Sequence, residues 1–374
     1  MTAARYRPPG DAALALADGR VFRGTSFGAR RDAGGEAVFT TTMTGYQEVC
    51  TDPSFYGQLV CMTYPLIGNY GVNLDDDESR QPWIAALIVR EVAEEPSNWR
   101  SSSSLDAYLF KHNVPGLSGI DTRALTRHIR SVGDTRAVIV QNAGTLTDEE
   151  LVGRASLATI PGEMDAVSVV AGDDVMTEGS EHGPHVVVVD CGVKRNIVRS
   201  LVRRGARVTT VPYGTPFPDI AALSPDGVVV SPGPGDPARL DSGLDVVREL
   251  TARRIPYFGI CLGHQLLARS LGAETEKLKF GHRGGNHPVK DQASGKVSIT
   301  AQNHGYMVTP EQVPTKDGWR VGLVNLNDGS VEGLRHDDLP VLSVQFHPEA
   351  SPGPQDNGYL FDEFLDMIRN PTQR

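Results

Sequence analysis

The sequence predicts an α/β protein with two domains: a mixed α+β domain followed by an α/β domain with a mostly parallel sheet and helices on both faces. Strand and helix patterns alternate after about residue 185, as they do in βαβ units. Before residue 145 the pattern is irregular and combines a hairpin signal with short helices. A length of 374 residues agrees with two to three domains. We therefore place the domains at 1–144 and 185–374, with a linker at 145–184.

Short apolar segments and turn signals define the first domain. An Asp18-Gly19 turn indicates a hairpin, and five segments have strand patterns: 13–16, 21–22, 37–42, 59–63 and 84–92. Helices are expected at 105–112 and at 122–132, the second between an Asp121 N-cap and a Gly133 stop. In the linker, 145–154 has the pattern of a short polar helix, whereas 171–183 is rich in Gly, Asp and Glu and has no periodicity.

Buried strands alternate with amphipathic helices in the second domain. The first strand, 186–189, is entirely β-branched and apolar, as expected of a strand with both faces covered. Further strands are expected at 208–211, 227–230, 256–260, 297–300, 320–325 and 341–346. Helices are expected at 194–204, at 240–253, directly after 260 up to 271, and at 360–368. In open α/β sheets ligands bind at the carboxyl ends of strands, so unusual residues there are the first functional candidates.

Composition narrows the class of function. A chain with 39% hydrophobic and 22% charged residues is an ordinary globular protein. Its net charge of −10 argues against nucleic acid as the main partner. Four cysteines without paired spacing favour a reducing compartment over a disulfide framework. Neither a signal peptide in residues 1–19 nor a membrane span is predicted. We expect a cytoplasmic protein, in which one thiol is available as a nucleophile.

The segment Gly259-Ile260-Cys261-Leu262-Gly263 joins a predicted strand to a predicted helix. This pattern is the thiol counterpart of the Gly-x-Ser-x-Gly nucleophile elbow. The glycines allow a sharp turn, while the helix N-terminus favours a thiolate and offers N–H groups to an oxyanion. Cys261 is therefore a candidate nucleophile, although a small buried residue at a strand end is the alternative interpretation of this motif by itself.

The segment His347-Pro348-Glu349 follows the strand at 341–346. A thiol nucleophile needs a base, and the base needs an acid that orients its ring. Residues two apart in an extended segment lie on one side, so Glu349 is placed to orient His347. Alone, this motif also fits a surface histidine near a glutamate; together with Cys261 it predicts a catalytic triad.

A third strand end, at 227–230, leads into the loop 231–237, Ser-Pro-Gly-Pro-Gly-Asp-Pro. Extended to Ala238, the loop nominally fits a dinucleotide-binding Gly-x-Gly-x-x-Ala pattern, but Pro234 and Pro237 remove N–H donors that a pyrophosphate would need. An oxyanion-binding N–H at Gly235 is the better interpretation. The chain contains no P-loop motif.

The remaining histidines and cysteines have structural interpretations. His282, His287 and His304 occur in segments that are predicted as turn-rich and lack metal-ligand spacing, so no metal site is predicted. His264 follows the elbow within its helix and is expected to be structural. Cys191 is expected to be a small buried thiol, as are Cys50 and Cys61.

With these three motifs in place, the second half of the chain resembles class I glutamine amidotransferase domains. Nearly the whole chain, 12–370, resembles the family of small subunits of glutamine-hydrolysing carbamoyl-phosphate synthases. The front-half segments that carry this resemblance are Thr42–Glu48, Thr51–Ser54 and Thr63–Asn69. Two segments of the second half extend it: Gly281–Pro288 and Glu349–Pro354.

The resemblance implies that Cys261 attacks the side-chain amide of glutamine, that His347 moves the proton and that Glu349 orients the ring. It implies an oxyanion site at the N–H groups of Gly235 and Leu262. The residues implied to bind glutamine are Ser54, Gly233, Gly235, Leu262, Gln265, Asn303, Gly305 and Tyr306. No cofactor is implied on this chain: ammonia passes to a large subunit that binds ATP, bicarbonate and magnesium and makes carbamoyl phosphate for arginine or pyrimidine synthesis.

Three other functions remain open from the residues. A stand-alone glutaminase or another amidotransferase subunit would share the triad, but it would lack the front-half motifs. A non-catalytic scaffold that docks on a synthetase would not need a nucleophile, a base and an orienting acid. A thiol protease would share the Cys-His pair but would need a peptide groove.

Overall fold

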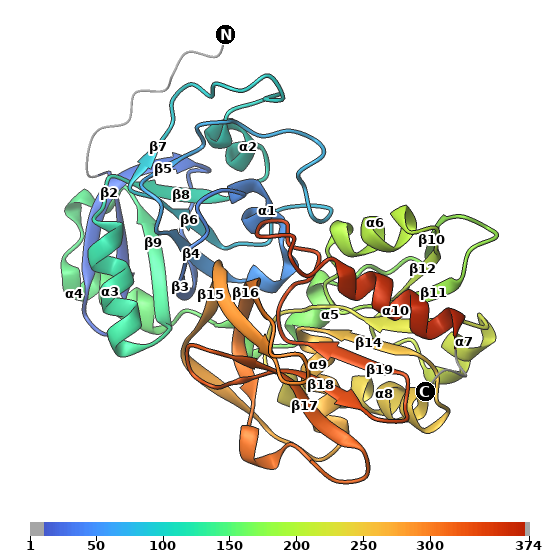
Figure 1. Cartoon of the computed structure of the whole chain (residues 1–374). Coiled ribbons are helices and arrows are strands. Elements are labelled where there is room, and N and C mark those ends of the chain that lie inside the picture. The colour runs from blue at the N-terminus through green and yellow to red at the C-terminus, as the bar shows by residue number, and fades with distance from the viewer. Residues whose placement is uncertain (1–10, 371–374) are drawn as a thin grey trace. The chain divides into compact units, whose positions relative to one another are not determined.

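The structure, a computed structural model, describes residues 11–370 and divides into two compact units, one ending at Met164 and the other beginning at Asp165 (Figure 1). The division falls inside the segment 145–184 that the sequence predicts as a linker. Residues 1–10, which belong to the segment predicted to lack a signal peptide, lie outside the described residues. Within 11–370, no helix is both long and apolar enough to span a bilayer.

The first unit is built on a closed barrel of mixed strands. Around the barrel the strands are β1 (Ala12–Leu16), β2 (Val21–Gly28), β8 (Pro115–Ser118), β6 (Ala86–Ile88), β4 (Gln58–Met62), β3 (Ala33–Thr40) and β9 (Thr135–Gln141). The pairs β3/β4, β4/β6 and β6/β8 are parallel and the others are antiparallel. The single strand predicted at 84–92 is wrong: it is divided into β6 and β7 (Glu91–Val92), and β7 pairs with β5 (Leu66–Ile67) in a separate small sheet.

Helices pack around this barrel, and capping side chains mark where some of them begin. They are α1 (Tyr46–Thr51), η1 (Pro53–Phe55), α2 (Leu105–Lys111), α3 (Thr122–Val132), η2 (Ala143–Thr145), α4 (Asp148–Ser156) and η3 (Pro161–Glu163). The predicted cap of α3 is confirmed, because the Asp121 side chain accepts from the N–H of Ala124 at 2.9 Å. A capping box of Thr147 and Glu150 starts α4, and Leu151 packs against apolar residues of β1 and β9. The first part of the predicted linker is therefore part of the first unit.

The second part of that segment belongs to the second unit. It forms α5 (Ala166–Val170) and β10 (Met176–Gly179), and β10 pairs antiparallel with β12 (Arg207–Pro212). All four residues of β10 are exposed. An edge strand with no buried face has no apolar alternation, which explains why 171–183 lacks periodicity in the sequence.

A ten-stranded sheet forms the centre of the second unit. Its middle is parallel and consists of β12, β11 (His185–Asp190), β13 (Gly227–Val230), β14 (Tyr257–Ile260) and β19 (Val341–Val344). Antiparallel strands extend it beyond β19: β18 (Val331–His336), β17 (Trp319–Asn325), β15 (Thr275–Asp291) and β16 (Val297–Val308). The predicted α/β class is confirmed, with antiparallel strands at both edges of a parallel centre.

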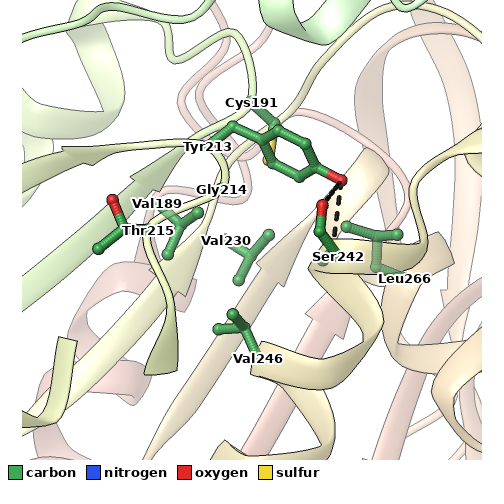
Figure 2. Close-up of a pocket in the computed structure, with 10 residues that line it drawn as sticks. Val189, Cys191, Tyr213, Gly214, Thr215, Val230, Ser242, Val246 and Leu266 are labelled. Atoms are coloured by element: carbon green, nitrogen blue, oxygen red, sulfur yellow. Dashed lines mark hydrogen bonds between the residues drawn. The ribbon is translucent and has the colours of Figure 1, made fainter. Parts of the chain in front are cut away.

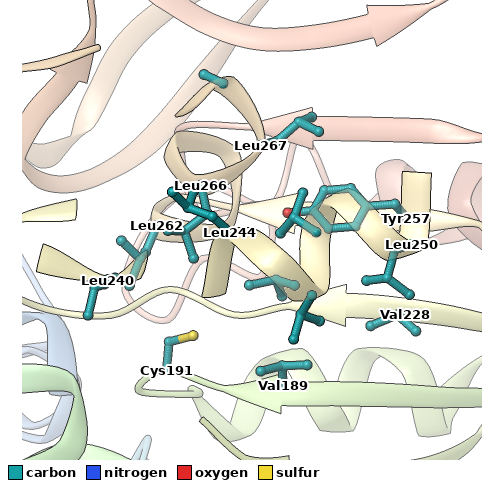
Figure 3. Packing of buried hydrophobic residues seen from close by; sticks show 14 of the residues in the cluster. Val189, Cys191, Val228, Leu240, Leu244, Leu250, Tyr257, Leu262, Leu266 and Leu267 are labelled. Atoms are coloured by element: carbon teal, nitrogen blue, oxygen red, sulfur yellow. The ribbon is translucent and has the colours of Figure 1, made fainter. Parts of the chain in front are cut away.

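Helices cover both faces of the parallel strands (Figure 1). They are α6 (Arg195–Arg203), α7 (Phe217–Ala222), η4 (Pro237–Arg239), α8 (Asp241–Ala252), α9 (Leu262–Ser270), η5 (Pro310–Gln312) and α10 (Tyr359–Arg369). Val187 and Val189 of β11 pack with α8 and α9 in the cluster of Figure 3, whereas Val186 and Val188 pack with α6 and α10. Both faces of β11 are buried, and this is the physical reason for its uninterrupted apolar sequence.

The region 275–308 differs from its prediction. The segments that the sequence predicts as turn-rich form two long paired strands, β15 and β16, and only 297–300 is predicted as a strand. Register shifts occur between Lys277 and His282 and between Gly284 and His287. Glycines at such irregularities have the same sequence signature as glycines in turns, which explains the wrong prediction.

Candidate active site

Cys261 lies at the junction of β14 and α9 in a strained backbone conformation, with φ 51° and ψ −99°. Its N–H donates to the carbonyl of Val344 at 2.8 Å, so the sheet holds the turn in place. A Cβ atom at Gly263 would lie 2.3 Å from the carbonyl oxygen of Val230, so this position requires glycine. The geometry is that of a nucleophile elbow, with the thiol at the N-terminus of a helix.

His347 follows β19 and is held from two sides. Its N–H donates to the carbonyl of Ala301 at 2.8 Å, and Nδ1 lies 2.7 Å from Oε1 of Glu349. Burial lowers the pKa of His347, but the Glu349 carboxylate and the Cys261 thiol outweigh burial and raise that pKa to about 10. Nε2 is buried and has no close hydrogen-bond partner within 11–370, so it can exchange a proton with Cys261.

Lys194 is a site residue that the sequence interpretation missed. Its Nζ lies 3.0 Å from Oε1 of Glu349 and donates to the carbonyl of Ala350, and its side chain is only 2% exposed. Burial raises the pKa of Glu349, but Lys194 and His347 together lower it to about 2, so the carboxylate stays ionised. A signal was present: Lys194 follows the buried strand 186–189 at the same edge of the sheet as Cys261.

Two glutamines connect the thiol to β16. Gln345, also missed in the sequence, donates from Nε2 to Sγ of Cys261 at 3.6 Å. Gln265 donates from Nε2 to Oε1 of Gln345 at 3.1 Å and to the carbonyl of Tyr306 at 2.8 Å. Sγ of Cys261 in turn lies 3.8 Å from the carbonyl oxygen of Asn303. These contacts place Gln265, Asn303 and Tyr306 around the candidate nucleophile.

The loop after β13 approaches the same helix. A Cβ at Gly233 would lie 2.7 Å from Cδ2 of Leu262, the first residue of α9. Gly235 has φ 87°, a conformation that favours glycine. The structure therefore brings Gly233 and Leu262 together beside Cys261, and Gly305 lies between Asn303 and Tyr306 on β16.

Ser54 lies in η1 of the first unit. Its N–H donates to the Asp52 side chain at 2.9 Å. Its hydroxyl is buried and has no hydrogen-bond partner within 11–370. A buried hydroxyl with unused hydrogen-bonding capacity is available to a ligand.

The residues expected to be structural are buried. Nδ1 of His264 lies 2.9 Å from the hydroxyl of Ser343, and burial lowers the pKa of His264 to about 3. Burial raises the pKa of Cys61 to about 12 and, to an even greater extent, those of Cys50 and Cys191. All three thiols are buried, which confirms the prediction that they are small buried residues, and burial disfavours the thiolate at each site.

A small apolar pocket lies elsewhere in the second unit. Figure 2 shows it between the ends of β11, β12 and β13 and the start of α8, with the Tyr213 hydroxyl bonded to Ser242 at 2.8 Å. Cys261, His347 and Glu349 do not line it. We therefore place the candidate active site at the elbow and not in this pocket.

The site and fold agree with family models over both units. Residues 187–367 match the model described as glutamine amidotransferase class-I, which includes the elbow and the His347-Pro348-Glu349 segment. The second unit is thus a class I glutamine amidotransferase domain. Residues 14–139 match the model described as carbamoyl-phosphate synthase small chain, CPSase domain.

Curated relatives extend the match over almost the whole chain. The chain is 49% identical to the carbamoyl phosphate synthase small chain of Archaeoglobus fulgidus, covering 96% of this chain and 99% of that one. It is 48% identical to that of Listeria monocytogenes, covering 96% and 97%, and 49% identical to that of Syntrophotalea carbinolica, covering 97% and 99%. The chain belongs to the carbamoyl phosphate synthase small chain family.

Proposed function

We propose that this chain hydrolyses the side-chain amide of L-glutamine, with Cys261 as nucleophile, His347 as general acid and base, and Glu349 as the group that orients His347. The observation that carries the proposal is the arrangement of these residues. A strained elbow presents the thiol beside an imidazole whose other nitrogen is hydrogen-bonded to a buried carboxylate. This is the arrangement of a triad-type nucleophile.

In the first half-reaction, the proton of the Cys261 thiol passes to Nε2 of His347 and the sulfur attacks the amide carbon. The raised pKa of His347 favours this transfer. The imidazolium then donates its proton to the amide nitrogen, the carbon–nitrogen bond breaks, and ammonia leaves behind a glutamyl thioester. In the second half-reaction, His347 takes a proton from water, the hydroxide attacks the thioester, and glutamate and the thiol are released.

Backbone groups support the tetrahedral intermediates. Leu262 is the first residue of α9, and the first N–H groups of a helix have no partner within the helix. We assign the oxyanion to the N–H groups of Leu262 and Gly235. For the glutamine substrate we assign the full predicted set: Ser54, Gly233, Gly235, Leu262, Gln265, Asn303, Gly305 and Tyr306.

The ammonia released from glutamine must reach a second active site. Family membership implies a large subunit as partner, and we propose that ammonia passes to it. ATP, magnesium and bicarbonate would bind on that subunit, which would make carbamoyl phosphate for arginine or pyrimidine synthesis, and this chain would need no cofactor for glutamine hydrolysis.

Replacing the nucleophile in the complex with the large subunit tests the site and the partnership together. Cys261→Ser is expected to abolish glutamine-dependent carbamoyl phosphate synthesis, by at least about 10³-fold, and to leave synthesis from free ammonia near the wild-type rate. Cys61→Ser, which replaces a buried thiol of the first unit, is the matched control and should retain both activities. A Cys261→Ser complex that still used glutamine at near wild-type rate would show that the nucleophile is misassigned.

The same measurements decide between the alternative functions. A non-catalytic scaffold would be indifferent to Cys261→Ser. A stand-alone glutaminase would hydrolyse glutamine equally well with and without the large subunit. The match of residues 14–139 to the small-chain domain already counts against this second alternative.

A further inference from the structure

The antiparallel part of the sheet brings together three residues that have no place in the glutaminase mechanism. The register pairs His282 of β15 directly with His304 of β16, and Glu332 lies on β18. One ring nitrogen of each histidine and one carboxylate oxygen of Glu332 lie within 4.8 Å of one another, and all three residues are buried. Strands β15, β16 and β18 can be followed in Figure 1.

His282 presents an acceptor to the centre of this cluster. Its Nε2 lies 2.8 Å from Oδ2 of Asp328, which accepts the proton of this nitrogen. In the neutral ring Nδ1 is then an acceptor. Nδ1 is buried, has no hydrogen-bond partner within 11–370, and lies 4.0 Å from Oε1 of Glu332, which is also an acceptor. A carboxylate that fixes the far nitrogen of a histidine is the usual outer partner of a metal ligand.

His304 also has an acceptor nitrogen that faces another acceptor. Its Nδ1 donates to the carbonyl of Tyr306 at 2.7 Å, so Nε2 of the neutral ring is an acceptor. Nε2 lies 2.9 Å from Oε1 of Gln302, another acceptor, because the Gln302 amide group donates to Glu332 at 2.9 Å. Facing acceptors in a buried place repel each other unless a positive charge lies beside them.

We propose that His282, His304 and Glu332 bind a zinc-type divalent ion through Nδ1, Nε2 and a carboxylate oxygen, respectively. Imidazole nitrogen and carboxylate oxygen are ordinary Zn²⁺ ligands, and three of them leave a fourth position for water. Glu332 and Asp328 together balance the two charges of the ion, whereas the nearby Arg283 guanidinium opposes it and limits the affinity.

The ion would tie together three strands that adjoin the elbow. His304 lies between Asn303 and Gly305 on β16, and its ring holds the same Tyr306 carbonyl that Gln265 contacts. The ligands are far apart in the sequence and meet only through strand pairing. The prediction of no metal site rests on sequence spacing, which is not informative for ligands on separate strands.

Metal binding to the full chain in its complex with the large subunit tests the proposal. After treatment with a chelator, Zn²⁺ should bind with a stoichiometry of one per small chain in competition with a zinc indicator, and it should raise the unfolding temperature. Co²⁺ should give visible d–d bands without a thiolate-to-cobalt charge-transfer band. His282→Asn and Glu332→Gln should abolish binding, and Asp328→Asn, at a half-exposed position, should weaken it by about 10- to 100-fold.

Two controls separate this site from other sources of binding. His128→Asn removes a partly buried histidine paired with Asp18 in the first unit and should leave zinc binding unchanged. Cys261→Ala should also leave the affinity unchanged. The proposal is overturned if no zinc binds above buffer level. In that case a proton, and not a metal ion, would lie between the facing acceptors. The proposal is also overturned if Cys261→Ala removes binding, or if binding survives all three site variants. If a buried variant fails to fold, Asp328→Asn decides.

Discussion

Nζ of Lys194 lies 3.0 Å from Oε1 of Glu349, the same oxygen that contacts Nδ1 of His347, and both side chains are almost completely buried. The Glu349 carboxylate is therefore shared between an imidazole and a lysine. A buried carboxylate needs this compensation, because desolvation alone would raise its pKa and favour the neutral acid. The lysine keeps Glu349 ionised and so keeps His347 oriented.

Replacing this lysine should therefore damage both stability and catalysis. Lys194→Met leaves a buried carboxylate with one partner, which is expected to cost about 3 to 5 kcal/mol of unfolding free energy. Glutamine hydrolysis should fall by roughly 10²-fold because His347 loses its fixed orientation. Urea unfolding and glutaminase assays measure the two effects. Arg195→Met, at the exposed neighbouring position, should change neither, and an unaffected Lys194→Met would contradict the role assigned to Lys194.

The stability of the protein should depend on pH through His347. Its pKa is raised to about 10 in the folded chain, against an ordinary value of 6.5. The stabilisation is therefore fully present below about pH 6.5 and is lost as pH rises through 10, at up to about 1.4 kcal/mol per pH unit. The unfolding free energies of wild type and His347→Gln should converge over this range. A difference that stays constant from pH 6.5 to 10 would mean that His347 does not gain a proton on folding.

Replacing Ser54 should weaken glutamine binding without destabilising the fold. Its hydroxyl is buried without a hydrogen-bond partner in the described chain, so Ser54→Ala should leave the unfolding free energy nearly unchanged. If the hydroxyl binds glutamine, KM should rise by about 2- to 10-fold. Ser79→Ala should show the opposite pattern, since its hydroxyl donates to the Thr51 carbonyl and accepts from Trp83. Steady-state kinetics and urea unfolding of both variants provide the comparison, and an unchanged KM for Ser54→Ala would remove this residue from the glutamine site.

The elbow should not tolerate a side chain at Gly263. Its Cβ would lie 2.3 Å from a backbone oxygen of β13, so Gly263→Ala should cost about 1 to 3 kcal/mol and displace the thiol. Glutaminase activity and the rate of thiol alkylation should both change. Gly153→Ala provides the control, because this helical glycine has open space and alanine should stabilise α4 by up to about 1 kcal/mol. Wild-type activity in Gly263→Ala would show that the elbow is less tightly packed than its geometry indicates.

Sequence signals from neighbouring residues were sufficient to predict much of the fold. The β-branched run of β11, the N-cap of α3 and the Gly-x-Cys-x-Gly segment each depend on near neighbours in the chain. The β8 sequence Pro-Gly-Leu-Ser was missed, because a proline and a glycine indicate a turn although all four residues are buried in the barrel. The division of 145–184 between both units was also missed, since it depends on which distant strands α4 and β10 contact.

The sequence by itself determined the candidate nucleophile, base and acid, because Cys261, His347 and Glu349 each follow a buried strand within a short, specific motif. Only the tertiary structure decided which groups surround them. Lys194 reaches Glu349, Gln345 reaches Cys261, and His282 meets His304, through pairing of strands that are remote in the chain. The physical reason is that motif chemistry is encoded in consecutive residues, whereas charge compensation and ligand geometry arise only when the sheet closes.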